Sequence, residues 1–298
     1  MVSISGIEGL EPTIKIIKYT KKIAIANKES IICGWDLIKD ELNKNKTKFI
    51  PVDSEHFSIW YALKEINLNL IEKIYLTASG GPFLNKPVKK LYKVKIKQAI
   101  NHPNWSMGKK ISIDSATMMN KVFEIIEAKK IFEISYNKLS IIIHPKSYVH
   151  AIIKLKNGLT KIIIHDTNMK IPIFNSLYSS KKFINSNYIN FKILNNLDFR
   201  DVNLKKFPLV KILKMLPNYN SLFETVLVSI NDKLVDLFLN NKIKFTDISK
   251  KMNKMLTLYS LEKYKKIRPK KIEDILNMNL KIKNDVESLV KNNAKINL

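Results

Sequence analysis

The sequence predicts an α/β fold that continues into a helical C-terminal part. In the first half, short β-type runs alternate with helical stretches, and the runs end in polar residues or in Gly or Pro, where α/β folds place their chemistry. In the last third, apolar residues recur at helical spacing. The strands expected in the first half are residues 23–26, 49–52, 73–77, 111–113 and 139–143.

The remaining elements of the first two thirds follow from the same patterns. Residues 12–22 and 118–132 have the apolar spacing of helices. A strand pair is expected at 149–155 and 160–165, because Asn157-Gly158 between them favours a hairpin turn.

The chain beyond residue 178 divides into two parts. Residues 179–206 are irregular and rich in Ser and Asn, which predicts a linker. Residues 207–298 are expected to be helical, with a helix start at Thr246-Asp247 and a break at Arg268-Pro269. Six apolar residues there share one helical face: Leu222, Val226, Ile230, Leu234, Leu237 and Phe238.

The charge is unusual for a folded chain of this length. The 298 residues carry a net charge of +26, from 52 basic and 26 acidic residues, and all but two of the basic residues are lysines. A surface selected to read phosphates is expected to use more arginine, whose planar guanidinium matches phosphate geometry. Lysine, isoleucine and asparagine are all abundant here and have A/T-rich codons, so genomic base bias explains the charge better than a nucleic-acid partner does.

The cellular compartment is also constrained. Cys33 is the single cysteine, which excludes an internal disulfide framework and a Cys-rich zinc site and fits a reducing compartment. No apolar run approaches the roughly 18 residues that a membrane span needs, and residues 1–6 lack the pattern of a signal peptide. We expect a cytoplasmic protein without a membrane or nucleic-acid partner.

Acidic residues follow the predicted strand 49–52. Asp53 and Glu55 flank Ser54, and side chains at positions i and i+2 of an extended segment project to one face. Two such carboxylates can chelate one hard cation. A solvated strand end is the commoner interpretation for an isolated pattern of this kind.

A glycine pair follows the predicted strand 73–77. Ser79-Gly80-Gly81 can turn backbone N–H groups and the Ser79 hydroxyl towards an anion. An ordinary turn closed by Pro82 is the alternative.

A third constellation crosses from the predicted strand 111–113 into a helix. Ser115 is expected near the helix N-terminus, where a phosphate binds readily. Asn120, Lys121 and Glu124 then lie on adjacent parts of one helical face. Such a helix end can hold an anion while Glu124 supplies a metal oxygen, and a cap followed by a routine Lys–Glu surface pair is the alternative.

Two further segments carry polar residues in suggestive places. Lys28 stands between Asn27 and Glu29 at the end of the strand 23–26, where it could pair with a substrate oxygen. The loop from His102 to Gly108 combines apolar and polar residues, which suits a lid that closes over a ligand and excludes water. The simpler interpretation of Lys28 is a solvated charge. The simpler interpretation of Trp105 in the loop is an anchor in the core.

Taken together, these motifs resemble one family. The runs that carry the resemblance are Ala26-Asn27-Lys28-Glu29-Ser30, Pro51-Val52-Asp53-Ser54-Glu55-His56, Ser79-Gly80-Gly81-Pro82-Phe83, the long run from His102 through Lys121, Ile143-His144-Pro145 with Ser147 and Val149-His150, and Met169 with Pro172. They resemble the 1-deoxy-D-xylulose-5-phosphate reductoisomerases of the non-mevalonate isoprenoid pathway. A weaker likeness extends to Asn231-Asp232 and residues 245–248.

The resemblance implies a role for each matching residue. It implies a Mg²⁺ or Mn²⁺ ion, or Co²⁺, held by Asp53, Glu55 and Glu124. The implied catalytic residues are these three with Lys28 and His102. The implied substrate-binding residues are Lys28, Ser54, Glu55, Ser79, His102, Ser115, Asn120, Lys121 and Glu124. Trp105 and Met107 would be lid residues, and Asn27, Glu29 and Gly108 would contact the cofactor NADPH.

The resemblance also implies an activity and a domain order. The family rearranges 1-deoxy-D-xylulose 5-phosphate and reduces the product with NADPH to 2-C-methyl-D-erythritol 4-phosphate, usually as a homodimer. Residues 1–50 would be the residual part of a Rossmann-like NADPH-binding domain, 51–178 the α/β catalytic domain with a mobile lid, 179–206 a linker and 207–298 a helical domain.

The nucleotide-binding half is where the sequence departs from the family. The family's glycine-rich dinucleotide loop is not found in the sequence, so we expect that most of the NADPH-binding domain is missing, unless a separate chain supplies it. A truncated, non-reducing chain that still binds metal and phosphosugar is the alternative. A basic nucleic-acid-binding protein is the least supported hypothesis.

Overall fold

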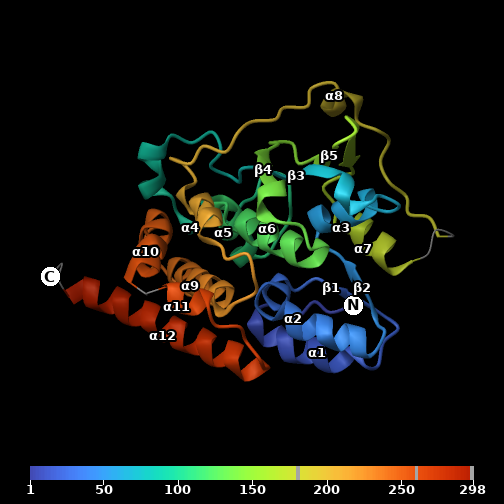
Figure 1. The fold of residues 1–298 in the computed structure, drawn as a ribbon. Helices are drawn as coiled ribbons and strands as arrows, with labels where there is room; N and C mark the ends of the chain where they lie inside the picture. Colours follow the sequence, from blue (N-terminus) through green and yellow to red (C-terminus); the bar gives the residue numbers. More distant parts are fainter. Residues whose placement is uncertain (179–181, 259–260, 296–298) are drawn as a thin grey trace.

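A computed structural model describes residues 1–178, 182–258 and 261–295 (Figure 1). Its strands form two sheets. The smaller sheet pairs β1 with β2 in parallel, and the larger has the order β4-β3-β5-β6. In the larger sheet β3 and β4 are parallel and the other pairs are antiparallel. The strand bounds are β1 Lys22–Ile25, β2 Lys48–Pro51, β3 Ile71–Ala78, β4 Leu139–Ile143, β5 Val149–Leu155 and β6 Thr160–Ile164.

Helices connect and cover the sheets. The α-helices are α1 Leu10–Ile17, α2 Lys28–Lys44, α3 Ser54–Ala62, α4 Ile96–Ala99, α5 Lys109–Thr117, α6 Met119–Phe132, α7 Lys170–Leu177, α8 Phe191–Leu194, α9 Leu222–Leu239, α10 Phe245–Leu258, α11 Leu261–Lys265 and α12 Ile272–Lys295. Short 3₁₀ helices lie at Ile7–Gly9, Leu68–Leu70, Val88–Lys93, Tyr136–Lys138 and Pro208–Met215. Figure 1 shows α9 to α12 gathered at one end of the molecule, with α6 beside the larger sheet.

Most of the expected elements are present. Six of the seven predicted strands are confirmed within two residues at either end, as are the helix 118–132 and the apolar face of α9. The predicted helix 12–22 is shorter and begins earlier, since α1 spans Leu10–Ile17. In residues 182–206 the structure has α8 and otherwise mostly irregular chain, as expected of the linker, while residues 179–181 of that linker lie outside the described residues. Residues 259–260 and 296–298 of the helical part lie outside them too.

The strand predicted at residues 111–113 is wrong. These residues belong to α5, which ends where Met118 adopts a left-handed conformation (φ 64°) and α6 begins. The alternation of Ile111-Ser112-Ile113 is too short to distinguish a strand from a helix. In the structure Ser112 and Thr117 donate side-chain hydrogen bonds to backbone carbonyls four residues earlier, and Ile113 faces the core.

Two apolar clusters stabilise this arrangement. The larger extends from Ile7 in the first segment through α2, α5 and α6 to Val286 in α12. The smaller lies between the larger sheet, α3 and α6, and includes Ile74 and Ile125. The larger cluster also includes Ile25 of β1, Ala78 of β3, Ile113 of α5 and Met119 of α6, so it holds the ends of these strands close to α5 and α6. None of the helices in the described ranges combines the length and apolar character that crossing a bilayer requires.

Candidate active site

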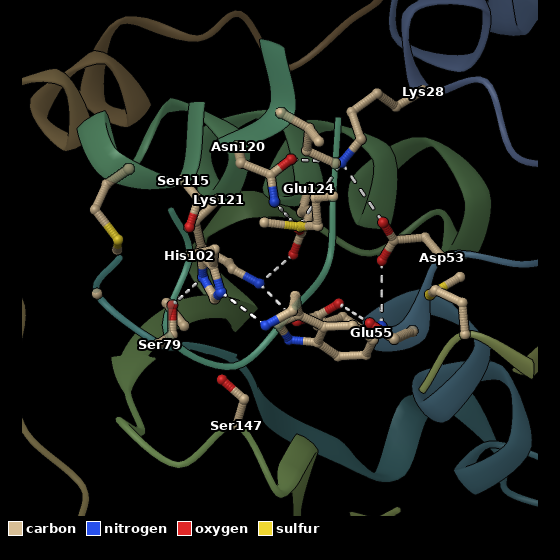
Figure 2. Close-up of a pocket in the computed structure, with 18 of the residues that line it drawn as sticks. Lys28, Asp53, Glu55, Ser79, His102, Ser115, Asn120, Lys121, Glu124 and Ser147 are labelled. Atoms are coloured by element: carbon tan, nitrogen blue, oxygen red, sulfur yellow. Dashed lines mark hydrogen bonds and ion pairs between the residues drawn. The ribbon is translucent and has the colours of Figure 1, made fainter. Parts of the chain in front are cut away.

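A pocket of about 220 Å³ opens where β1, β2 and β3 end against α5 and α6. The loop from residue 101 to 108 lies across it. Figure 2 shows polar side chains from these separate elements converging on the pocket. The lining includes Lys28, Asp53, Ser54, Glu55, Ser79, His102, Trp105, Met107, Ser115, Asn120, Lys121 and Glu124.

The three carboxylates predicted to bind a metal are brought together. One oxygen of each of Asp53, Glu55 and Glu124 lies within 4.8 Å of the others. Asp53 is the N-cap of α3 and accepts a hydrogen bond of 3.2 Å from the backbone N–H of Glu55, so the helix start orients the first two carboxylates. Glu124 reaches the same point from α6 and is 1% exposed.

Two lysines lie between these carboxylates. Lys28 Nζ is 3.5 Å from Asp53 Oδ2 and 3.8 Å from Glu124 Oε1. It also donates a hydrogen bond of 2.6 Å to Asn120 Oδ1. Lys121 Nζ is 2.9 Å from Glu55 Oε1 and forms an ion pair with Glu124 as well (Figure 2). Both ammonium groups are buried, so in this state they balance most of the charge of the triad.

Burial and charge shift the pKa values of this group in opposite directions. Burial, together with the nearby Glu55 carboxylate, raises the pKa of Glu124. Burial alone would lower the pKa of Lys28, but the carboxylates of Asp53 and Glu127 outweigh it and raise that pKa. The lysine is therefore charged at neutral pH, whereas Glu124 is the carboxyl group that most needs a cation to stay ionised.

This donor set fits a hard divalent cation. Three carboxylate oxygens within reach of one another are the ligands that Mg²⁺ or Mn²⁺ accepts. The Lys28 and Lys121 ammonium groups supply positive charge beside the same carboxylates.

His102 is held on the opposite side of the pocket. Its Nδ1 accepts hydrogen bonds from the backbone N–H groups of Trp105 and Asn104, at 3.0 and 3.2 Å. The ring proton is therefore on Nε2, which donates to Ser79 Oγ at 2.9 Å. Burial and the neighbouring Lys121 ammonium lower the pKa of His102 to about 4. The imidazole is accordingly neutral at physiological pH.

The loop that carries Trp105 is anchored next to β5. Asn104 Nδ2 donates to Pro145 O at 2.6 Å and to Ser147 Oγ at 2.9 Å. The Trp105 ring packs edge-on to His150, with 6.0 Å between ring centroids. Trp105 and Met107 both line the pocket, as expected of lid residues.

Ser115 lines the pocket, but not for the predicted reason. It lies in the last turn of α5 rather than near the N-terminus of a helix. Its backbone carbonyl packs against Gly81, where an added Cβ would come within 2.9 Å of that oxygen. Gly81 has a φ of 66°, so only glycine combines this conformation with so close an approach.

The three predicted cofactor residues do not line the pocket. Asn27 accepts from the backbone N–H of Ser30 and donates to the carbonyls of Gly6 and Ile4. The Glu29 carboxylate is 2.6 Å from Lys110 Nζ. Gly108 faces open space. The side chains of Asn27 and Glu29 are therefore already engaged within the chain.

Several site residues were missed by the sequence reasoning. Ser147 and Met169 line the pocket, although they were noted only as part of the resemblance. Behind Asp53 lie His56 and Glu127, both buried. His56 Nδ1 lies 3.4 Å from Asp53 Oδ1 and 3.9 Å from Glu127 Oε2. The sequence signal for Glu127 was its spacing of three residues from Glu124 on one helix.

The fold and the site together define a class of protein. A carboxylate triad, buried lysines and a polar loop at the carboxyl ends of an α/β sheet are typical of metal-dependent enzymes that act on small anionic substrates.

Comparisons with known proteins identify the family. Residues 49–132 match the 1-deoxy-D-xylulose 5-phosphate reductoisomerase C-terminal domain, 165–285 the DXP reductoisomerase C-terminal domain, and 1–34 the 1-deoxy-D-xylulose 5-phosphate reductoisomerase profile. The reductoisomerase of Pelagibacter ubique is 60% identical over 280 residues, which cover 94% of this chain and 72% of that protein. The one from Sulfurihydrogenibium sp. is 41% identical over 92% of this chain and 71% of that protein. This chain belongs to the 1-deoxy-D-xylulose 5-phosphate reductoisomerase family.

Solved structures agree with the sequence comparison. A DOX-P reductoisomerase in complex with NADPH, fosmidomycin and magnesium superposes with a TM-score of 0.88 at 33% identity, covering 97% of this chain and 75% of that one. The Zymomonas mobilis reductoisomerase in complex with NADPH gives 0.84 at 31% identity, covering 97% and 74%.

Proposed function

We propose that this chain binds 1-deoxy-D-xylulose 5-phosphate with a divalent metal ion and converts it, with NADPH, to 2-C-methyl-D-erythritol 4-phosphate. The observation that carries this proposal is the convergence of Asp53, Glu55 and Glu124 opposite the Ser79–His102 pair in one pocket. Membership of the reductoisomerase family supports the reaction.

The carboxylate triad would hold the metal ion, which when bound supplies Lewis-acid polarisation of the sugar's carbonyl and hydroxyl oxygens. The chain's own residues orient the substrate around that point. Lys28 and Ser54 face the hydroxyketone end, since both line the pocket beside the triad. Lys28 is well placed because its ammonium group is already within ion-pair distance of Asp53.

The phosphate would bind between the glycine turn and the two helices. Ser79, Ser115 and Asn120 present hydroxyl and amide groups to the pocket, and Lys121 adds a positive charge. Neutral His102 donates its Nε2 proton towards this side, because Nδ1 is occupied by backbone donors. Trp105 and Met107 would close over the sugar and exclude water.

For NADPH the fit of the described residues is poor, and we derive no step through it. Asn27 and Glu29 are engaged within the chain, and no glycine-rich dinucleotide loop is found in the described ranges. The engagement of Asn27 and Glu29 within the chain favours a second candidate function, a non-reducing protein that binds metal and phosphosugar.

The test is a pair of measurements on the purified chain. With Mg²⁺ present, calorimetry is expected to show fosmidomycin binding that disappears when EDTA is added. Substrate-dependent loss of NADPH absorbance would establish the full reaction, and binding without that loss would establish the second candidate. Absence of metal-dependent fosmidomycin binding would reject both.

We further propose a cytoplasmic homodimer with the domain order given above. One family profile begins at residue 49, close to the proposed boundary at residue 50. The buried, unpaired thiol of Cys33 supports a reducing compartment.

A further inference from the structure

A second charged cluster lies beside the pocket without lining it. Lys110, in the first turn of α5, places its Nζ 2.6 Å from Glu29 Oε1, 3.1 Å from Asp114 Oδ2 and 3.0 Å from Asp232 Oδ1. These carboxylates belong to three helices, α2, α5 and α9. The Lys110 ammonium also lies 5.5 Å from the centre of the buried Phe123 ring.

The cluster has more negative than positive charge. Glu29 and Asp114 are buried, and Asp232 is largely so, yet one ammonium group serves all three. Asn231 relieves part of the imbalance by donating to Asp114 Oδ1 at 2.7 Å. Burial would lower the pKa of Lys110, but the three carboxylates outweigh it and raise that pKa, so the residue stays charged. Moving Lys110 away would leave buried carboxylates uncompensated, so its position is strongly constrained.

The position of this cluster matters because of its neighbours in the chain. Lys110 comes two residues after Gly108, the last residue of the loop 101–108. Glu29 directly follows Lys28, whose ammonium group contacts Asp53 and Asn120 in the pocket. One ion-pair cluster therefore connects the end of the loop, the first turn of α2 that presents Lys28, and helix α9 of the C-terminal part.

We propose that Lys110 is a positioning residue. It fixes the C-terminal end of the loop 101–108 to α2 and α9, so that the loop closes over the ligand from a fixed pivot while Lys28 keeps its place. His102, bonded to Ser79 and to the backbone of the loop, is the other fixed end. This inference rests on the proposed function, because the ligand over which the loop closes is the one proposed there.

The test compares Lys110→Met with Lys110→Arg in the full chain. With Mg²⁺ present, Lys110→Met is expected to weaken fosmidomycin binding about tenfold or more, because small displacements of positioned groups are costly. Mg²⁺ affinity should change less than twofold, since Asp53, Glu55 and Glu124 are not in the cluster. Lys110→Arg, which keeps the charge, should recover most of the fosmidomycin affinity. Lys109→Met, an exposed lysine on the same turn, is the matched control.

Hydrogen exchange gives a readout that needs no ligand. In Lys110→Met the amides of residues 103–108 should exchange faster than in the wild type, with α6 unchanged. Asp232→Asn should also exchange the amides of residues 103–108 faster than the wild type, by a smaller factor. This variant provides the test if Lys110→Met does not fold. The proposal would be overturned if the variants exchanged the amides of this loop at the same rate as the wild type and also bound fosmidomycin with the same affinity. Failure of the wild type to bind fosmidomycin would instead count against the proposed function and leave the exchange comparison as the test.

Discussion

Glu124 is the residue on which the metal assignment depends most. It is the most buried of the three carboxylates, and its pKa is raised by burial and by Glu55. It also connects the triad to both Lys28 and Lys121. A side chain in this situation gains more from a bound cation than an exposed carboxylate would, because the cation compensates a charge that water cannot reach.

We therefore expect Glu124→Gln to weaken Mg²⁺ binding by about 10- to 100-fold, by analogy with the loss of other groups that support a metal site. Isothermal titration with Mg²⁺ measures this directly. Glu133→Gln is the control, since Glu133 lies at the end of the same helix with its side chain 64% exposed. An unchanged titration for Glu124→Gln would remove this residue from the ligand set.

The lowered pKa of His102 predicts how the stability of the protein depends on pH. The pKa of His102 is lowered to about 4, whereas a histidine in an unfolded chain has its ordinary pKa of about 6.5. Between these values the unfolded state binds a proton that the folded state does not, so stability falls as the pH falls through this window. Thermal unfolding of wild type and His102→Gln should differ in slope between pH 6.5 and 4, with the shallower slope for the variant. Parallel curves would show that His102 is not held neutral.

At the scale of elements, α9 is the central support of the C-terminal part. Its N-terminus is capped by Ser221, whose hydroxyl accepts from the backbone N–H of Phe223 while Glu224 bonds back to Ser221. The helix packs against α12 and α2, and most of its residues are buried. It also carries Asn231 and Asp232 to the Lys110 cluster. This helix thus connects the C-terminal part to the edge of the candidate site.

Ile230 in the middle of α9 is fully buried, so Ile230→Ala should destabilise the protein by about 2–5 kcal/mol through lost apolar burial and the cavity left behind. Ile230→Val should cost about 0.5–1.5 kcal/mol. Urea unfolding monitored by circular dichroism measures both. Leu280→Ala on α12, where the side chain is 61% exposed, is the control and should change stability little. Equal effects for Ile230→Ala and Leu280→Ala would contradict the packing described for α9.

At the scale of the whole molecule, one apolar cluster crosses the proposed domain boundaries. It includes Ile7 and Leu10 from the first segment, Phe123 from α6, and Ile275 and Val286 from α12. The first segment, which we propose belongs to a nucleotide-binding domain, therefore shares its core with the C-terminal helices.

A shared core predicts a single cooperative unfolding transition rather than one for each proposed domain. Circular dichroism and tryptophan fluorescence should give the same midpoint, and fosmidomycin with Mg²⁺ should raise both together, because a ligand that binds only the folded state stabilises it. Two separate midpoints, with only one raised by the ligand, would show that the core does not couple these parts.

The amino-acid sequence by itself determined the order of strands and helices and the residue types of the site. Periodicity and turn residues are local properties, so β4 and β5 were predicted with their observed bounds. Lys28, Asp53, Glu55 and Ser79 were recognisable because they follow predicted strands, and the carboxyl ends of strands converge in α/β folds.

Only the tertiary structure decided what each charged group meets. It placed Ser115 in the last turn of α5, because burial of Ile113 outweighed the strand-like alternation around it. It engaged Glu29 with Lys110 and brought Asp232 from α9 to the same ammonium group. Contacts between residues so distant in the chain depend on how the helices pack, and the local spacing of residues does not determine that packing. The sequence therefore indicated which side chains bear the chemistry, and the packing of α2, α5 and α9 determined which of them face the pocket.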